Sequence, residues 1–300
     1  MTAPADHPPA PPVGRRIAVG NGHLFMHRDG TGRPPVIVLP GAGAVALDYW
    51  SLHQAVSKLT TSILYDRAGT GWSDPAPLPR SAREVTDELR TLLQAMGEKP
   101  PYLFIGHSLG GGYARHYAQR FPGEVAGLLL LDPLHEDGNR LYPAEVVQTE
   151  DRVGQPIPDL PAPMLEAYRA LFEQKLATVP AHIREPLIAH HGAAWRTGMR
   201  EASNVNALYD ELRHGGPLPT VPVIVMTAMA LDPVQRQFMP EELLHRVNVA
   251  KRTMNLSVVA SAPRGEHREL PDASHAWMCQ EETEAITQAV DDLLDSIRAA

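Results

Sequence analysis

The segment GHSLGG, residues 106–111, places a serine among glycines, between an apolar run and a helical pattern. Gly106 to Gly110 fits the pattern G-x-S-x-G. A strand that turns sharply into a helix strains the backbone at the central serine and requires small neighbours, which leaves the hydroxyl exposed. A serine alcohol is a weak nucleophile until a base accepts its proton. We therefore expect Ser108 to act as a nucleophile if other segments supply a base, an acid and oxyanion donors.

The base is expected from the segment LPDASHAWM near the end of the chain. The sequence contains 14 histidines, so residue type alone selects none of them. His275 follows the last expected strand and precedes the last expected helix, where a loop can reach the carboxyl edge of a parallel sheet. This placement makes His275 the candidate general base.

Two aspartates could supply the acid. Asp232 lies beyond the strand VPVIVMTA, and Asp132 lies directly at the end of the strand VAGLLLLDP. Either residue keeps the chain order serine, acid, histidine, and a buried carboxylate would hold the imidazole in the required tautomer. We prefer Asp232 and keep Asp132 as the alternative acid.

Two backbone N–H groups are candidates for an oxyanion hole. The N–H of Leu109 begins the helix after the serine, where backbone N–H groups have no partner within the helix. The second candidate is the N–H of Ala42 in the loop LPGAGA, because Gly41 and Gly43 let this loop bend close to the serine.

Short strand-like runs alternate with helical patterns, which predicts an α/β fold with a mostly parallel sheet flanked by helices. A hairpin is expected with its turn at residues 21–22, and a helix over residues 80–96. Between residues 134 and 220 the strands stop, and helix formers broken by prolines predict an inserted helical cap. The expected organisation is a disordered Pro-rich tail over residues 1–16, a core over 17–133 and 221–300, and the cap over 134–220.

Composition disfavours several other classes of protein. The formal charge is −8, and no basic stripe suggests a nucleic-acid or anionic-membrane partner. No run approaches the roughly 20 apolar residues of a membrane span. Cys279 is the single cysteine, which excludes an internal disulfide and is consistent with a cytoplasmic protein. We expect no metal, since no third ligand lies at a spacing from His190 and His191 that is typical of metal sites. We also expect no cofactor.

The expected cap is rich in large apolar side chains, which could line a pocket for the apolar part of a substrate or only hold the cap to the core. They are Met164, Leu165, Tyr168, Leu171, Phe172, Trp195, Met199 and Tyr209.

The sequence resembles the α/β-hydrolase fold superfamily, on the side of serine esterases with a helical lid. The resemblance runs from about residue 17 to the C-terminus and is carried by LPGAG, YDRAGTGWSD, GHSLGG and DASHAW. It departs from the family at Pro40, where many members have histidine, and in the turn before Asp232, which is one residue longer and lacks a glycine. A serine at the nucleophile position speaks against epoxide hydrolase and haloalkane dehalogenase chemistry.

The resemblance and the residues together imply a serine hydrolase that cleaves a small carboxylic ester or related acyl bond through an acyl-enzyme. Lactones, thioesters and carbon–carbon bonds are variants that the motifs do not separate. Two alternatives are a cofactor-free haloperoxidase or perhydrolase-like enzyme that uses the same residues, and a non-enzymatic ligand sensor on the same fold. The natural substrate and the oligomeric state are left open.

Overall fold

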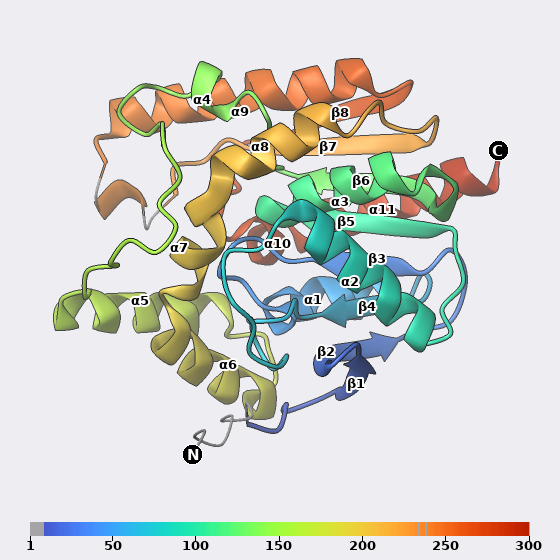
Figure 1. Ribbon diagram of the computed structural model, residues 1–300, viewed down its shortest axis with the longest axis horizontal. Coiled ribbons are helices and arrows are strands. Elements are labelled where there is room, and N and C mark those ends of the chain that lie inside the picture. Colours follow the sequence, from blue (N-terminus) through green and yellow to red (C-terminus); the bar gives the residue numbers. More distant parts are fainter. Residues whose placement is uncertain (1–8, 233–234, 238, 300) are drawn as a thin grey trace.

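The computed structural model describes residues 9–232, 235–237 and 239–299. Its centre is a sheet of eight strands in the order β1-β2-β4-β3-β5-β6-β7-β8 (Figure 1). β1 and β2 pair as an antiparallel hairpin, β2 pairs antiparallel with β4, and all remaining neighbours are parallel. The expected mostly parallel α/β fold is confirmed. The strands are Arg15–Val19, Gly22–Asp29, Val36–Leu39, Ser62–Tyr65, Tyr102–His107, Val125–Leu131, Pro222–Ala228 and Arg264–Leu270.

Helices cover both faces of the sheet because successive side chains of a strand point to opposite faces. In β5, Leu103 and Ile105 pack in one apolar cluster with α1 (Trp50–Val56) and α11 (Thr283–Arg298). Phe104 packs in the other cluster, with α2 (Ala82–Ala95), α3 (Leu109–Arg120) and α9 (Glu241–Ser261). These strand residues are fully buried, and each such side chain contributes about 1.5–3 kcal/mol by leaving water.

The helix expected over residues 80–96 is α2. Ser81 caps it by accepting a hydrogen bond from the N–H of Glu84, and the Glu84 carboxylate accepts from the N–H of Ser81 in return. Val85 and Leu89 lie on its buried face, as the spacing predicts. The core begins slightly earlier than expected, because β1 starts at Arg15. Residues 1–8 of the expected disordered tail lie outside the described residues.

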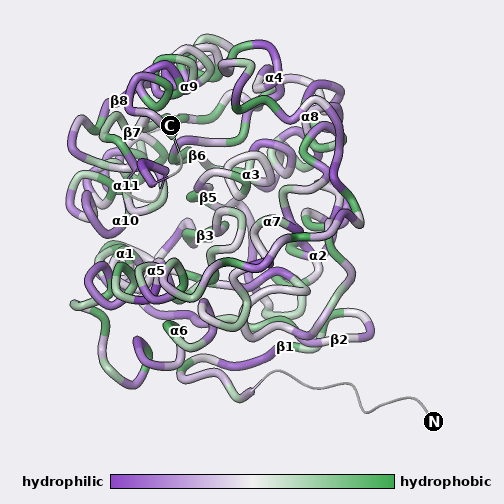
Figure 2. Tube along the Cα trace, turned by 90° about the vertical axis from the view of Figure 1, so that its left-hand side faces the viewer, coloured by the Kyte–Doolittle hydropathy of each residue, from purple (hydrophilic) through white to green (hydrophobic). Residues whose placement is uncertain are grey.

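A helical insertion, residues 134–220, follows β6 and precedes β7, and we call it the cap. α5 and α6 lie side by side in both views (Figures 1 and 2), and α7 leads from them to α8, which packs on α3. The α-helices of the cap are α4 (Gly138–Leu141), α5 (Ala162–Lys175), α6 (Ala181–Ala194), α7 (Thr197–Glu201) and α8 (Val205–His214). In the core, α10 (Met278–Glu281) lies between β8 and α11. Among the described residues, no helix combines the length and apolar character that crossing a bilayer requires.

Candidate active site

Ser108 stands on a strained turn between β5 and α3. Its φ is 52°, in the left-handed region that residues other than glycine rarely adopt. Only glycine fits at the neighbouring positions: a Cβ on Gly110 would lie 2.1 Å from the backbone oxygen of Leu39, and one on Gly106 would lie 2.7 Å from that of Gly110. The turn therefore has the geometry that the G-x-S-x-G pattern predicts.

Three side chains from distant segments meet at this turn. His275 Nε2 lies 3.1 Å from Ser108 Oγ, and His275 Nδ1 lies 3.0 Å from Asp132 Oδ2. The imidazole is partly exposed, with 27% of the side chain accessible, whereas the Asp132 side chain is fully buried. Because an ionised carboxylate only accepts, the imidazole carries its proton on Nδ1 and presents Nε2 as an acceptor to the serine hydroxyl.

The surroundings of Asp132 keep its carboxylate ionised. Burial opposes ionisation, but the Lys251 ammonium and the hydrogen bonds from His275 and Lys251 outweigh it and hold the pKa of Asp132 well below its usual value. Lys251 Nζ lies 2.7 Å from Asp132 Oδ2, and Asn255 Nδ2 donates to Oδ1 at 3.1 Å. A charged carboxylate at this place can stabilise a protonated imidazole.

The preference for Asp232 as the acid does not match this geometry. Asp232 Oδ2 accepts the backbone N–H of Ala276 at 3.1 Å, and its Oδ1 accepts that of Gln235 at 3.1 Å. The carboxylate therefore supports the main chain of the histidine loop, and the alternative, Asp132, faces the imidazole. Asp132 reaches the ring because it ends β6 directly with a φ of 44°, whereas the turn after β7 is longer.

The two oxyanion candidates come from separate segments that both approach the serine. Leu109 is the first residue of α3, so its N–H is among those without a partner inside the helix. Ala42 lies on the loop after β3 and lines the same cavity as Ser108. The loop approaches closely, since a Cβ on Gly41 would lie 3.3 Å from Ser108 Cβ.

A hydrogen-bonded chain through His107 joins three loops of the site. His107 Nε2 faces the backbone oxygen of His275 at 2.9 Å and must donate to it, so Nδ1 accepts from the Tyr49 hydroxyl at 2.7 Å. The Tyr49 oxygen in turn accepts the N–H of Gly41 at 3.0 Å. Burial and the nearby His275 lower the pKa of His107 to about 3, so this ring is neutral and structural.

A cavity of about 510 Å³ lies between the core and the cap at this site. Of the eight apolar cap residues expected to be available for a pocket, four line it: Tyr168, Phe172, Trp195 and Met199. Met164 and Leu171 line a smaller neighbouring cavity, and Tyr209 packs against Gly138. The cavity wall is therefore partly apolar, with polar groups gathered around Ser108.

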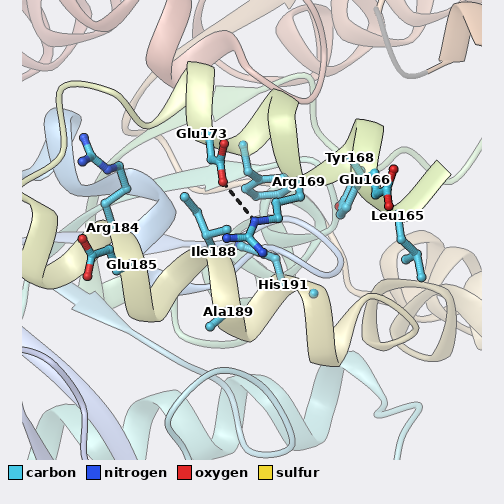
Figure 3. Close-up of a pocket in the computed structure, with 12 residues that line it drawn as sticks. Leu165, Glu166, Tyr168, Arg169, Glu173, Arg184, Glu185, Ile188, Ala189 and His191 are labelled. Carbon is cyan, nitrogen blue, oxygen red and sulfur yellow. Dashed lines mark hydrogen bonds and ion pairs between the residues drawn. The ribbon is translucent and has the colours of Figure 1, made fainter. Parts of the chain in front are cut away.

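A second cavity, of about 960 Å³, lies between α5 and α6. Figure 3 shows charged side chains along it, with Arg169 hydrogen-bonded to Glu173. It shares Tyr168, Phe172 and His191 with the cavity at Ser108 but contains neither Ser108 nor His275. The cavity of about 510 Å³, which contains Ser108 and His275, is therefore the candidate active site.

Comparison with known proteins decides the family. The family model described as "alpha/beta hydrolase fold" matches residues 34–216, more than half of the 300 residues. The chain belongs to the α/β-hydrolase fold family. This confirms the resemblance inferred from the motifs.

Sequence relatives of this α/β-hydrolase match over part of their length. The (lyso)-N-acylphosphatidylethanolamine lipase of Bos taurus is 32% identical over 120 residues, which cover 39% of this chain and 34% of the lipase. The uncharacterized protein YbdG of Bacillus subtilis is 29% identical over 121 residues, covering 40% of this chain and 37% of that protein. The matched part thus spans about a third of these relatives.

Solved structures match over nearly the whole chain. A meta-cleavage product hydrolase from Pseudomonas fluorescens IP01 has a TM-score of 0.66 and 17% identity, covering 95% of this chain and 98% of that one. A thermophilic esterase from Thermogutta terrifontis has a TM-score of 0.59 and 18% identity, covering 94% and 98%. At these identities the likeness shows the fold. Together with the family and the lipase relative, it supports a hydrolase.

The two histidines considered for a metal have other partners in this α/β-hydrolase. His191 Nε2 lies 2.8 Å from Asp48 Oδ1, and His190 stacks on Trp72. Within the described ranges, no group of three or more His, Cys, Asp or Glu side chains is placed to hold a metal ion. Cys279 is buried, and burial raises the pKa of its thiol well above the usual value.

Sequence reasoning missed Lys251 and Asn255 beside the candidate acid Asp132. Both lie on the buried face of α9, at helical spacing from Leu244 and Val258. The sequence did offer a signal. Lys251, Asn255 and also Asn248 lie on the helix face where apolar residues are expected. Buried polar residues at such positions indicate a partner across the interface. Here that partner is Asp132 at the end of β6.

Proposed function

We propose that this protein is a serine hydrolase that cleaves a carboxylic ester or a related acyl bond. Ser108 is the nucleophile, His275 the general base and Asp132 the acid that orients the imidazole. One observation carries the proposal: the two nitrogens of His275 lie 3.1 Å from Ser108 Oγ and 3.0 Å from Asp132 Oδ2. A nucleophile, a base and an orienting acid in hydrogen-bond contact form the arrangement that activates a serine.

The reaction proceeds in two halves. His275 Nε2 accepts the hydroxyl proton as Ser108 Oγ bonds to the carbonyl carbon, and the carbonyl oxygen becomes an oxyanion held by the N–H groups of Ala42 and Leu109. Collapse breaks the bond to the leaving group, which takes the proton from His275. Water then repeats the sequence on the acyl-enzyme, which releases the acid and restores the serine. Each oxyanion donor is expected to contribute about 3–4 kcal/mol to transition-state stabilisation.

The cavity and the structural neighbours support a substrate class for this proposal. A volume of about 510 Å³ with aromatic and methionine side chains in its wall suits a small molecule with an apolar part. The structural neighbours include proteins named as an esterase, an enol-lactonase and an N-acyl homoserine lactone degrading enzyme. These names favour an ester or lactone for this chain.

The test is labelling with a fluorophosphonate probe, followed by hydrolysis of p-nitrophenyl esters of increasing chain length. We expect a covalent adduct on Ser108 and burst kinetics, with both signals lost in Ser108→Ala and labelling strongly slowed in His275→Ala. An absence of any adduct on folded wild-type protein would favour the ligand sensor. Peroxide-dependent halogenation exceeding ester hydrolysis would favour the haloperoxidase reading.

A further inference from the structure

The loop that carries the candidate oxyanion donor Ala42 is held by a buried arginine. Arg67 follows β4, is 2% exposed, and donates to the backbone oxygens of Pro40 at 2.7 Å and Gly41 at 2.9 Å. The oxygen of Gly41 and the N–H of Ala42 belong to one planar trans peptide unit, so they point in opposite directions. By binding this oxygen, Arg67 turns the N–H of Ala42 away from itself.

A carboxylate from the cap holds both the arginine and the loop. Glu201, at the end of α7, accepts from Arg67 Nε at 2.9 Å through Oε1 and from the backbone N–H of Gly43 at 2.8 Å through Oε2. The Glu201 side chain is 3% exposed and that of Arg67 is 2% exposed. A buried ion pair is costly to desolvate, and removing one partner leaves an uncompensated charge. The position of the loop is therefore tied to the position of α7.

The same helix touches the loop backbone to backbone. A Cβ on Gly43 would lie 2.9 Å from Gly198 Cα, and a Cβ on Gly198 would lie 3.1 Å from Gly43 Cα. Gly43 also has a φ of +73°, which favours glycine. α7 thus lies against the loop with no side chain between them, and a shift of α7 must move the loop or open a gap.

We propose that Glu201 is a positioning residue through which the cap sets the geometry of the oxyanion hole. The inference rests on the proposed function, with Ala42 as a donor. Glu201 orients Arg67, Arg67 orients the Gly41–Ala42 peptide, and Glu201 directly fixes the next peptide through Gly43. An oxyanion donor acts only when it lies about 2.7–3.1 Å from the developing negative oxygen. The hole is therefore complete only while α7 is seated on the core.

The test compares Glu201→Ala and Glu201→Gln with the wild type. The control is Glu211→Ala, a cap carboxylate on α8 that accepts the N–H groups of Ala82 and Arg83 and does not line the cavity at Ser108. We expect Glu201→Ala to lower kcat on a p-nitrophenyl ester by about 10- to 100-fold with KM changed less than threefold, because a misplaced donor costs less than a deleted one. Affinity for an alkyl boronic acid, which forms a tetrahedral adduct on Ser108, should fall in the same proportion.

Glu201→Gln keeps an acceptor for Gly43 but loses the charge facing Arg67, so we expect an intermediate kcat. Glu211→Ala should keep the wild-type kcat even where its Tm falls by as much as that of the Glu201 variants. The inference is overturned if both Glu201 variants keep the wild-type kcat, if Glu211→Ala loses as much kcat, or if only KM changes. Should Glu201→Ala fail to fold, Glu201→Gln and its boronate affinity decide alone. Failure of the proposed function would look different, because the wild type itself would then show no ester hydrolysis and no adduct on Ser108.

Discussion

Lys251 Nζ donates a hydrogen bond to Asp132 Oδ2 at 2.7 Å, on the same oxygen that faces His275 Nδ1. The Asp132 carboxylate is thus shared between the buried side chain of Lys251 and the imidazole of His275. Lys251 also donates to the backbone oxygen of Ala228 at 3.0 Å, which joins the carboxyl ends of β6 and β7 under the histidine loop.

Replacement of Lys251 by methionine should free the Asp132 carboxylate for His275. We expect the acidic limb of the kcat/KM profile to move to higher pH, because without the Lys251 ammonium the pKa of the Asp132 carboxyl rises. Loss of one partner of a buried ion pair should also lower stability by about 3–5 kcal/mol. The control is Arg246→Met, which removes an exposed ion pair from the same helix. An unchanged profile in folded Lys251→Met would contradict the electrostatic role.

The two candidate acids can be separated by paired substitutions. We expect Asp132→Asn to lower kcat by about 10⁴-fold, because an amide cannot hold the imidazole in the required tautomer. Asp232→Asn should stay within about tenfold of wild type, since an amide oxygen can still accept a backbone N–H group, such as that of Ala276 or Gln235, that Asp232 binds. Circular dichroism establishes that both variants fold. A larger loss in Asp232→Asn would restore the preference drawn from the sequence.

The pair between Arg115 and Glu136 predicts a pH dependence of stability. Burial raises the pKa of Glu136, but the hydrogen bonds and charge of Arg115 lower it overall to about 2. A carboxyl with a lowered folded pKa stabilises the protein above its unfolded pKa, near 4.5, and this contribution is lost as pH falls toward 2. Wild type should therefore exceed Glu136→Gln in unfolding free energy by about 1–3 kcal/mol at pH 6, and the gap should close on acidification. Urea unfolding at several pH values measures it, and a gap that is independent of pH would count against the pair.

A comparison of two glycines tests whether close packing at the serine turn requires glycine there. A Cβ on Gly110 would meet the backbone oxygen of Leu39 at 2.1 Å, so Gly110→Ala should lower stability by about 3 kcal/mol or more. Around Gly123 a Cβ would meet nothing within 4 Å, and Gly123→Ala should be neutral or stabilising by up to about 1 kcal/mol. Thermal unfolding of the two variants gives the comparison, and equal Tm values would show that the turn tolerates a shift of β3.

Local sequence patterns anticipated the elements of the site. The apolar run before Ser108 and the glycines around it predicted the strand, the turn and the helix, because these patterns reflect side-chain alternation and backbone sterics within a few residues. The position of His275 between the last strand and the last helix predicted a loop at the carboxyl edge of the sheet. There it meets Ser108.

The sequence by itself determined the alternation of strands and helices, the strained serine and the candidate histidine, since each depends on neighbours along the chain. Only the tertiary structure decided that Asp132 rather than Asp232 faces His275, that Lys251 shares this carboxylate, and that Glu201 reaches Arg67 and Gly43. These partners lie more than 100 residues apart in sequence. Their contacts depend on strand order and on how α9 and the cap pack against the strand ends, which no local pattern encodes.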